Sequence, residues 1–182
     1  LYPLNLVLSF FVSDAGLSYA VYEYQVVFHV ALGGYFMFLF LRELNLDFAS
    51  SLLGGGLFAF NAFFISHAHH AGMVHAGIWL PLVFYFCRRG FRLTPKWFLG
   101  CPIVLAISLF AGHPQITIYI FYAFTAYYIF LAYAAKGGRL QSASRYGLVI
   151  VLFFLLGAVQ LLPTFEFLQN TARNVLSYGD AV

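Results

Sequence analysis

Four of the six histidines in this chain of 182 residues lie in one short stretch, SHAHHAGMVHAGIWLP, from Ser66 to Pro81. They are His67, His69, His70 and His75, and we call them the histidine knot. Histidine can bind metals and can act as a general acid or base near neutral pH. A helical metal site commonly places histidines at i and i+4, but His67 and His70 stand at i and i+3 with no Glu or Cys nearby.

We therefore predict that the knot holds no metal and that the chain needs no cofactor. Acid or base chemistry stays open, although no carboxylate is adjacent to the knot in the sequence. In the simpler alternative, the histidines bond to one another, to backbone carbonyls and to water at a membrane surface. We expect at least one of them to contact a ligand.

Further polar residues occur beside apolar runs in the second half of the chain. His113-Pro114-Gln115 follows Gly112 and could be a plain turn or a polar hairpin that projects into a cavity. Glu166 and Arg173 are seven residues apart, about two helical turns, so they could share a face or form a solvated pair. The substrate-binding candidates of this region are His113, Gln115, Gln160, Glu166 and Arg173.

The composition decides which kind of protein can present these groups. The chain is 63% hydrophobic and only 8% charged, and its mean hydropathy is +0.87. Because a soluble domain is about 25% charged, we predict an integral membrane protein. The apolar runs are continuous and do not alternate as barrel strands do, so the predicted fold class is an all-α polytopic helix bundle. The net charge of +3 comes from short loops and does not indicate nucleic-acid binding.

We predict one transmembrane domain over residues 1–182, with about six spans. Residues 1–16 are too short for a span, which needs about 20 apolar residues, and we expect an interfacial or re-entrant segment there. Residues 163–182 should begin an external loop after the sixth span stops at Pro163. Because the chain opens with Leu1, we expect an internal fragment of a longer protein. The predicted spans are Leu17–Leu41, Phe48–Ile65, Ala71–Cys87 with a kink at Pro81, Trp97–Ala111, Gln115–Ala135 and Tyr146–Leu162.

The basic residues predict how this bundle is oriented. With six spans, the loops 42–47, 88–96 and 136–145 lie on one side and carry eight of the nine basic residues, while the other side carries only Arg173. The positive-inside rule makes the basic side cytoplasmic. The histidine knot and the 112–115 turn are then external, and both cysteines, Cys87 and Cys101, lie toward the reducing side, where a disulfide is not expected. His29 lies near the middle of the first predicted span, and we expect it to be a buried histidine that is bonded to a neighbouring helix.

Several stretches resemble one known family. They are LYPLN at the start, HVALGGYFMFLFLREL, the knot with IWLPL, AGHPQ, GAVQLLPTFE and TARNVLSY. Together they resemble the YfhO-type bacterial membrane proteins, a branch of the GT-C superfamily of membrane glycosyltransferases. The resemblance spans nearly the whole chain.

The resemblance implies a multi-pass protein of the bacterial cytoplasmic membrane that uses a polyprenyl-phosphate-linked sugar at its external face. The acceptor would be an envelope polymer or a glycolipid. The family's acidic catalytic residue would precede LYPLN and so lie outside this chain. We expect the sugar donor to be bound by eight residues of this chain: His67, His70, His75, His113, Gln115, Gln160, Glu166 and Arg173.

Two other classes remain open from the sequence. A transporter or lipid flippase commonly shows inverted repeats and charges within its spans, and His29 and Pro81 are the features that fit it. A non-catalytic membrane assembly protein would have its external polar residues dispersed. A cavity lined by the knot, the 112–115 turn and residues 160–173 would favour the enzyme.

Overall fold

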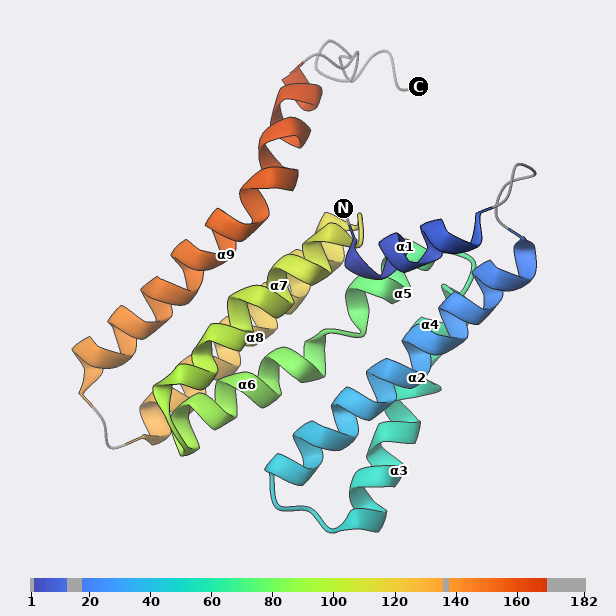
Figure 1. Ribbon diagram of the computed structural model, residues 1–182. Helices are drawn as coiled ribbons and strands as arrows, with labels where there is room; N and C mark the ends of the chain where they lie inside the picture. Colours follow the sequence, from blue (N-terminus) through green and yellow to red (C-terminus); the bar gives the residue numbers. More distant parts are fainter. Residues whose placement is uncertain (1, 13–17, 136–137, 170–182) are drawn as a thin grey trace, which may run out of the picture.

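The computed structural model describes residues 2–12, 18–135 and 138–169, and every regular element in these ranges is a helix (Figure 1). The predicted all-α class is confirmed. The elements are α1 (Pro3–Leu8), η1 (Ser9–Phe11), α2 (Tyr19–Glu43), α3 (Phe48–Ala59), α4 (Ala62–Ser66), α5 (Ala71–Gly77), α6 (Leu80–Arg92), η2 (Pro95–Leu99), α7 (Gly100–Phe110), α8 (Pro114–Ala134) and α9 (Arg139–Gln169).

Five helical stretches are long and apolar enough to cross a membrane, which agrees with a multi-pass protein. They are Tyr19–Glu43, Phe48–Ser66, Ala71–Arg92, Pro114–Ala134 and Arg139–Gln169.

The predicted fourth span is shorter than the other five. It forms an apolar helical stretch over Pro95–Phe110, about 24 Å long at 1.5 Å per residue. Thr94 before it is extended, and Gly112 after it has a φ of +87°, a left-handed conformation that ends the helix.

Two of the long stretches are interrupted by residues that favour a break. Asn61 separates α3 from α4, because its side chain accepts from the Phe64 N–H at 3.0 Å and caps the second segment. The stretch after the knot breaks between α5 and α6, just before Pro81. The kink predicted from Pro81 is thus confirmed, and the two segments change direction there (Figure 1).

The boundaries predicted for the last span were wrong at both ends. We predicted a loop through Arg145 and a helix end at Pro163, but α9 begins at Arg139 and continues past Pro163 to Gln169. A proline removes only one backbone donor, and apolar helices in membranes tolerate this loss. The Thr164 hydroxyl donates to the Gln160 carbonyl oxygen at 2.7 Å, which adds a bond at the turn where Pro163 lies.

Glycines set the closest approach between two helices. A Cβ added to Gly55 on α3 would lie 2.7 Å from the carbonyl oxygen of Gly34 on α2, and one added to Gly34 would lie 3.0 Å from the Gly55 oxygen. No side chain fits at that distance. The small residues therefore allow the close contact between α2 and α3.

The buried core lies mainly where α5 and α6 meet α7 and α8. Ser108 of α7 donates to the Ala76 carbonyl oxygen of α5 at 3.0 Å and shares a hydrogen bond of 3.1 Å with Thr117 of α8. All three residues are buried. A buried polar contact of this kind fixes the register of three helices. The largest core residues around it include Val74, Ile78, Val83, Leu105 and Phe124.

The basic segments gather at one end of the bundle. Glu43, at the end of α2, is only 6% exposed and forms ion pairs with Arg89 at 3.3 Å and Arg92 at 2.5 Å of α6. At the α8–α9 junction, Tyr128 donates to the Ser142 carbonyl oxygen at 2.8 Å. The opposite end of the bundle carries α1, the start of α5 and the α7–α8 turn (Figure 1). The described long helical stretches therefore run alternately toward one end of the bundle and the other, as was expected when the loops 42–47, 88–96 and 136–145 were placed on one side.

Candidate functional site

The structure divides the histidine knot into two groups. His67, His69 and His70 lie in the turn between α4 and α5, where His67 is half-buried and the other two are exposed. Their rings are near one another, with centroids 4.1 Å apart for His69 and His70 and 6.3 Å apart for His67 and His70. The His67 Nδ1 lies 2.9 Å from the Phe63 carbonyl oxygen. These three histidines form a polar surface at one end of the bundle.

His75 lies one turn into α5 and is 4% exposed. Its ring stacks on that of His29 of α2, with centroids 3.8 Å apart and an interplanar angle of 26°. The ring of Tyr2, the residue immediately before α1, also stacks on that of His75, with centroids 5.5 Å apart and an interplanar angle of 13°. Three segments far apart in the sequence thus meet in one buried aromatic cluster.

The hydrogen bonds of His29 define its protonation. Its Nδ1 lies 2.7 Å from the Gln25 carbonyl oxygen, which can only accept, so Nδ1 carries the proton. Its Nε2 lies 2.9 Å from the Tyr2 hydroxyl and, in the neutral ring, accepts from it. Burial raises the pKa of the Tyr2 phenol, which keeps this hydroxyl protonated as a donor. The prediction that His29 is a buried histidine is confirmed, and its partner outside α2 is Tyr2, the residue just before α1, where we had expected a residue of a neighbouring helix.

One polar atom of this cluster, Nε2 of His75, lacks a hydrogen-bond partner among the described residues, although His75 is only 4% exposed. The side chain of Trp79, which is 7% exposed, interacts with the Tyr2 phenol and acts against the rise in its pKa. Trp79 lies in the break before α6, with its ring 5.2 Å from that of Phe36. Since buried polar atoms are nearly always bonded, the cluster has hydrogen-bonding capacity beyond what Tyr2 uses.

The 112–115 turn lies beside the knot. A Cβ added to Gly72, at the start of α5, would lie 3.4 Å from the Ala111 carbonyl oxygen and 3.9 Å from the Cβ of His113. His113 is half-buried, and its Nδ1 has no hydrogen-bond partner among the described residues. Gln115 is exposed and donates to the Tyr119 hydroxyl at 2.6 Å. The structure thus places the 112–115 turn beside the start of α5, the helix that follows the knot turn.

The third predicted group lies on α9. Gln160 is half-buried and lines a groove of ≈ 410 Å³ together with Pro163, Thr164 and other α9 residues. Glu166 is exposed, and Arg173 lies outside the described residues. In Figure 1 the last turns of α9 extend beyond the ends of α7 and α8. No knot histidine lines this groove, so it does not join Gln160 to the knot.

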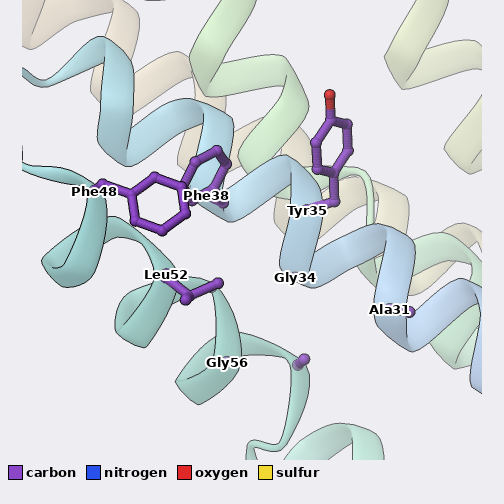
Figure 2. A pocket seen from close by; sticks show the side chains of 9 residues that line it. Ala31, Gly34, Tyr35, Phe38, Phe48, Leu52 and Gly56 are labelled. Atoms are coloured by element: carbon purple, nitrogen blue, oxygen red, sulfur yellow. The ribbon is translucent and has the colours of Figure 1, made fainter.

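A groove that was not predicted lies between α2 and α3 (Figure 2). It has a volume of ≈ 430 Å³, and its lining is apolar apart from Tyr35, whose hydroxyl points away from α3. Phe38 and Phe48 meet at one end, with ring centroids 5.6 Å apart. The paired glycines of the two helices are the sequence signal for it. The lining residues are Ala31, Gly34, Tyr35, Phe38, Phe48, Leu52, Gly55, Gly56 and Ala59.

Among the residues that the structure describes, no group of three or more His, Cys, Asp or Glu side chains could hold a metal ion. Cys87 and Cys101 are both buried free thiols.

Sequence reasoning did not find the roles of Tyr2 and Trp79. Tyr2 belongs to a short apolar segment with no periodic pattern, and Trp79 was one aromatic residue among many. Their importance depends on packing between distant segments, which no local pattern encodes. No family model matches the chain, and no curated protein or solved structure shows significant similarity to it.

Proposed function

We propose that this chain is part of a glycosyltransferase-like multi-pass protein of the bacterial cytoplasmic membrane. It would use a polyprenyl-phosphate-linked sugar at the external face and transfer that sugar to an envelope polymer or a glycolipid. The motifs that resemble the YfhO-type proteins support this proposal. So does the separation of the basic residues from the histidines along the bundle.

One observation carries the proposal: at the end of the bundle opposite the basic segments, Gly72 at the start of α5 lies beside Ala111 and His113. His67 and His70 belong to the turn just before α5, and His113 and Gln115 lie at the start of α8. Polar, titratable groups are costly near a bilayer and commonly mark a functional site there. Two separate polar turns that adjoin at one end make a more specific surface than either turn alone.

The chemistry of these residues suits a phosphate-linked donor. When the sugar leaves, negative charge develops on the polyprenyl phosphate, and hydrogen-bond donors or cations must stabilise it. The His113 ring, whose Nδ1 has no hydrogen-bond partner among the described residues, and the exposed Gln115 amide are suited to that role. The acid that would deprotonate the acceptor hydroxyl is expected outside this chain. This part of the protein would therefore hold the donor and not the base.

The orientation belongs to the same proposal. Arg88, Arg89, Arg92 and Lys96 lie at the end that carries Glu43, and the positive-inside rule places this end in the cytoplasm. The knot surface then faces the outside.

The test is sugar transfer from a polyprenyl-linked donor by the full-length protein in membrane vesicles. Changing His113→Ala together with Gln115→Ala should lower the rate at least about tenfold, because two donors to the developing charge are lost. Ser144→Ala, at the opposite end of the bundle, is the matched control and should retain the rate. Unchanged transfer by the double variant would contradict the proposal.

A transporter or lipid flippase remains the second candidate, because the stacked pair of His29 and His75 is buried inside two membrane-length helices. Intramembrane ionisable residues often line a transport path. Movement of a labelled lipid or a proton across proteoliposomes, without any sugar transfer, would support this alternative.

A further inference from the structure

A groove between α8 and α9 has no part in the proposed function. It lies at the basic end of the bundle, where α8 ends and α9 begins (Figure 1), and its volume is ≈ 620 Å³. Three tyrosines, Tyr128, Tyr133 and Tyr146, line it together with Arg139, the first residue of α9. The rest of the described lining is apolar or small, and none of it is acidic. We call this feature the α8–α9 groove.

The floor of the α8–α9 groove is held in place by its own hydrogen bonds. The buried Tyr128 donates from its hydroxyl to the Ser142 carbonyl oxygen at 2.8 Å, and the hydroxyls of Tyr146 and Thr125 share a hydrogen bond of 2.8 Å. The rings of Tyr128 and Tyr146 pack with centroids 5.1 Å apart. Because these hydroxyls already have partners, the floor gives the groove its shape and leaves ligand binding to the rim.

The rim carries a cation without a counter-ion. Arg139 and Tyr133 are both exposed, and neither side chain forms a hydrogen bond or an ion pair with another residue in the described part of the chain. The carboxylates at this end are engaged elsewhere, since Glu43 is paired with two other arginines and Asp47 caps α3. The rim therefore offers a positive charge and a phenol hydroxyl to a ligand.

The groove changes from polar to apolar along its length. Ile129 lies four residues before Tyr133, about 6 Å deeper along α8, and its side chain is exposed. Both helices are long and apolar enough to cross a membrane. Their adjoining ends then lie at the depth of the lipid headgroups, where tyrosines are enriched, and Ile129 lies among the acyl chains. A ligand that matches both parts has a negatively charged head and an apolar tail.

We propose that the α8–α9 groove binds an anionic phospholipid of the adjacent leaflet, with the lipid phosphate at Arg139 and Tyr133 and an acyl chain along Ile129. A guanidinium can bind two phosphate oxygens through parallel N–H bonds, and the Tyr133 hydroxyl can donate a further one. Basic pockets between membrane helices recognise lipid headgroups in this way. The described lining has no carboxylate for the amine of a zwitterionic headgroup, so an anionic lipid fits better. The inference needs only that α8 and α9 span a membrane and does not rest on sugar transfer.

The experiment is native mass spectrometry of the full-length protein in detergent micelles, which gives the dissociation constant of the first lipid bound. The probes are dioleoylphosphatidylglycerol, which is anionic, and dioleoylphosphatidylcholine, which has the same chains and a zwitterionic headgroup. Wild type should prefer the anionic lipid about tenfold, and Arg139→Gln should remove that preference. Lys96→Gln removes the same charge from an exposed site at the same end, outside the groove, and should bind as wild type does. Equal losses in the two variants, or no preference in wild type, would overturn the proposal.

A second variant separates the groove from its charge. Ala143→Phe adds a ring to the exposed wall of the groove and keeps Arg139 and Tyr133, so it should also remove the preference for the anionic lipid. Ala126→Phe adds the same ring at an exposed position of α8 outside the groove and should leave the preference intact. If Ala143→Phe does not fold, Ala143→Leu takes its place. A preference that survives filling of the groove contradicts the proposal.

A soluble competitor tests whether the ligand is a lipid. Glycerol 3-phosphate carries the phosphate of the headgroup without the acyl chains, and it should not displace phosphatidylglycerol from wild type even in large excess. Displacement would show that the groove is a site for a soluble phosphate and would overturn the assignment to a lipid.

Discussion

The six histidines of this chain differ in what surrounds each ring. His29 and His75 are buried and stacked, while His69 and His70 are exposed in a turn. The spacing of the knot suggested one group, yet His75 belongs with two residues, Tyr2 and His29, that are distant in the sequence. The first turn of α5 separates His75 from the other three knot histidines. The residues packed around His75 therefore determine its chemistry more than its position in the sequence of the knot does.

The hydrogen bond between Tyr2 and His29 gives a prediction about stability. Tyr2→Phe keeps the stacked ring but leaves His29 Nε2 buried and without its partner. We expect the free energy of unfolding to fall by about 1–2 kcal/mol, measured by denaturant titration in detergent micelles. Tyr19→Phe, at an exposed tyrosine, should change it by less than about 0.5 kcal/mol. Equal effects of the two substitutions would contradict the bond.

Glu43 gives a second prediction at the same scale. Its carboxylate is nearly buried and neutralises Arg89 and Arg92, whose side chains are 25% and 44% exposed. Glu43→Gln should destabilise the protein by about 2 kcal/mol, less than the 3–5 kcal/mol of a fully buried pair because the arginines reach water. The exposed Glu23→Gln is the control in thermal unfolding. A melting temperature that falls equally in both variants would show that the pair contributes nothing specific.

At the scale of the helices, the contact between α2 and α3 depends on the absence of side chains. Gly55→Ala would place a Cβ 2.7 Å from the Gly34 carbonyl oxygen, and a backbone atom cannot move aside as a side chain can. We expect a loss of about 1–3 kcal/mol. Gly56→Ala, one residue along, meets nothing within 4 Å and should be neutral or stabilising, because alanine favours helix. The reverse order of the two variants in unfolding experiments would contradict this packing.

The start of α3 has a pH-dependent cap. The Asp47 carboxylate accepts from the Ser50 backbone N–H at 2.9 Å and from its hydroxyl at 2.7 Å, and these bonds hold the pKa of Asp47 below its usual range. A lowered folded-state pKa means that the stabilisation is present above the unfolded pKa, about 3.9, and is lost as pH falls through the folded value.

The hydrogen-exchange protection factor of the Ser50 amide, the observed rate compared with the intrinsic rate at each pH, should therefore fall on acidification below about pH 4. Asp47→Asn keeps a capping side chain but cannot titrate, so its protection factor should not show this fall. An identical acid response in the variant would show that Asp47 is not the responsible group.

The prolines show how far local patterns predicted the helices. Pro81 was expected to kink a helix and does so, because the chain breaks just before it. Pro163 was expected to end a helix, yet α9 continues for six more residues. Pro81 stands in the first turn of α6, where a backbone N–H would have no intrahelical partner, whereas Pro163 lies inside α9 and removes an interior bond. Whether a helix breaks or continues at a proline depends on surrounding contacts, which the sequence does not reveal.

For the whole molecule, composition and apolar run length were enough to predict an all-helical membrane bundle and the order of its segments. That the knot turn and the 112–115 turn lie at the same end of the bundle also follows from topology. The buried cluster of Tyr2, His29 and His75 could not be predicted, because it joins three segments that are distant in the sequence through side-chain packing.

The central claim is that the molecule has a cytoplasmic basic end and an external histidine end. Cysteine labelling tests it directly, because the native Cys87 and Cys101 are 0% exposed and should not react. His69→Cys and Ser144→Cys each place one exposed thiol at opposite ends of the bundle. In right-side-out membrane vesicles, a membrane-impermeant maleimide should label His69→Cys at once and Ser144→Cys only after the vesicles are opened. Labelling of Ser144→Cys in sealed vesicles, with His69→Cys protected, would contradict the account.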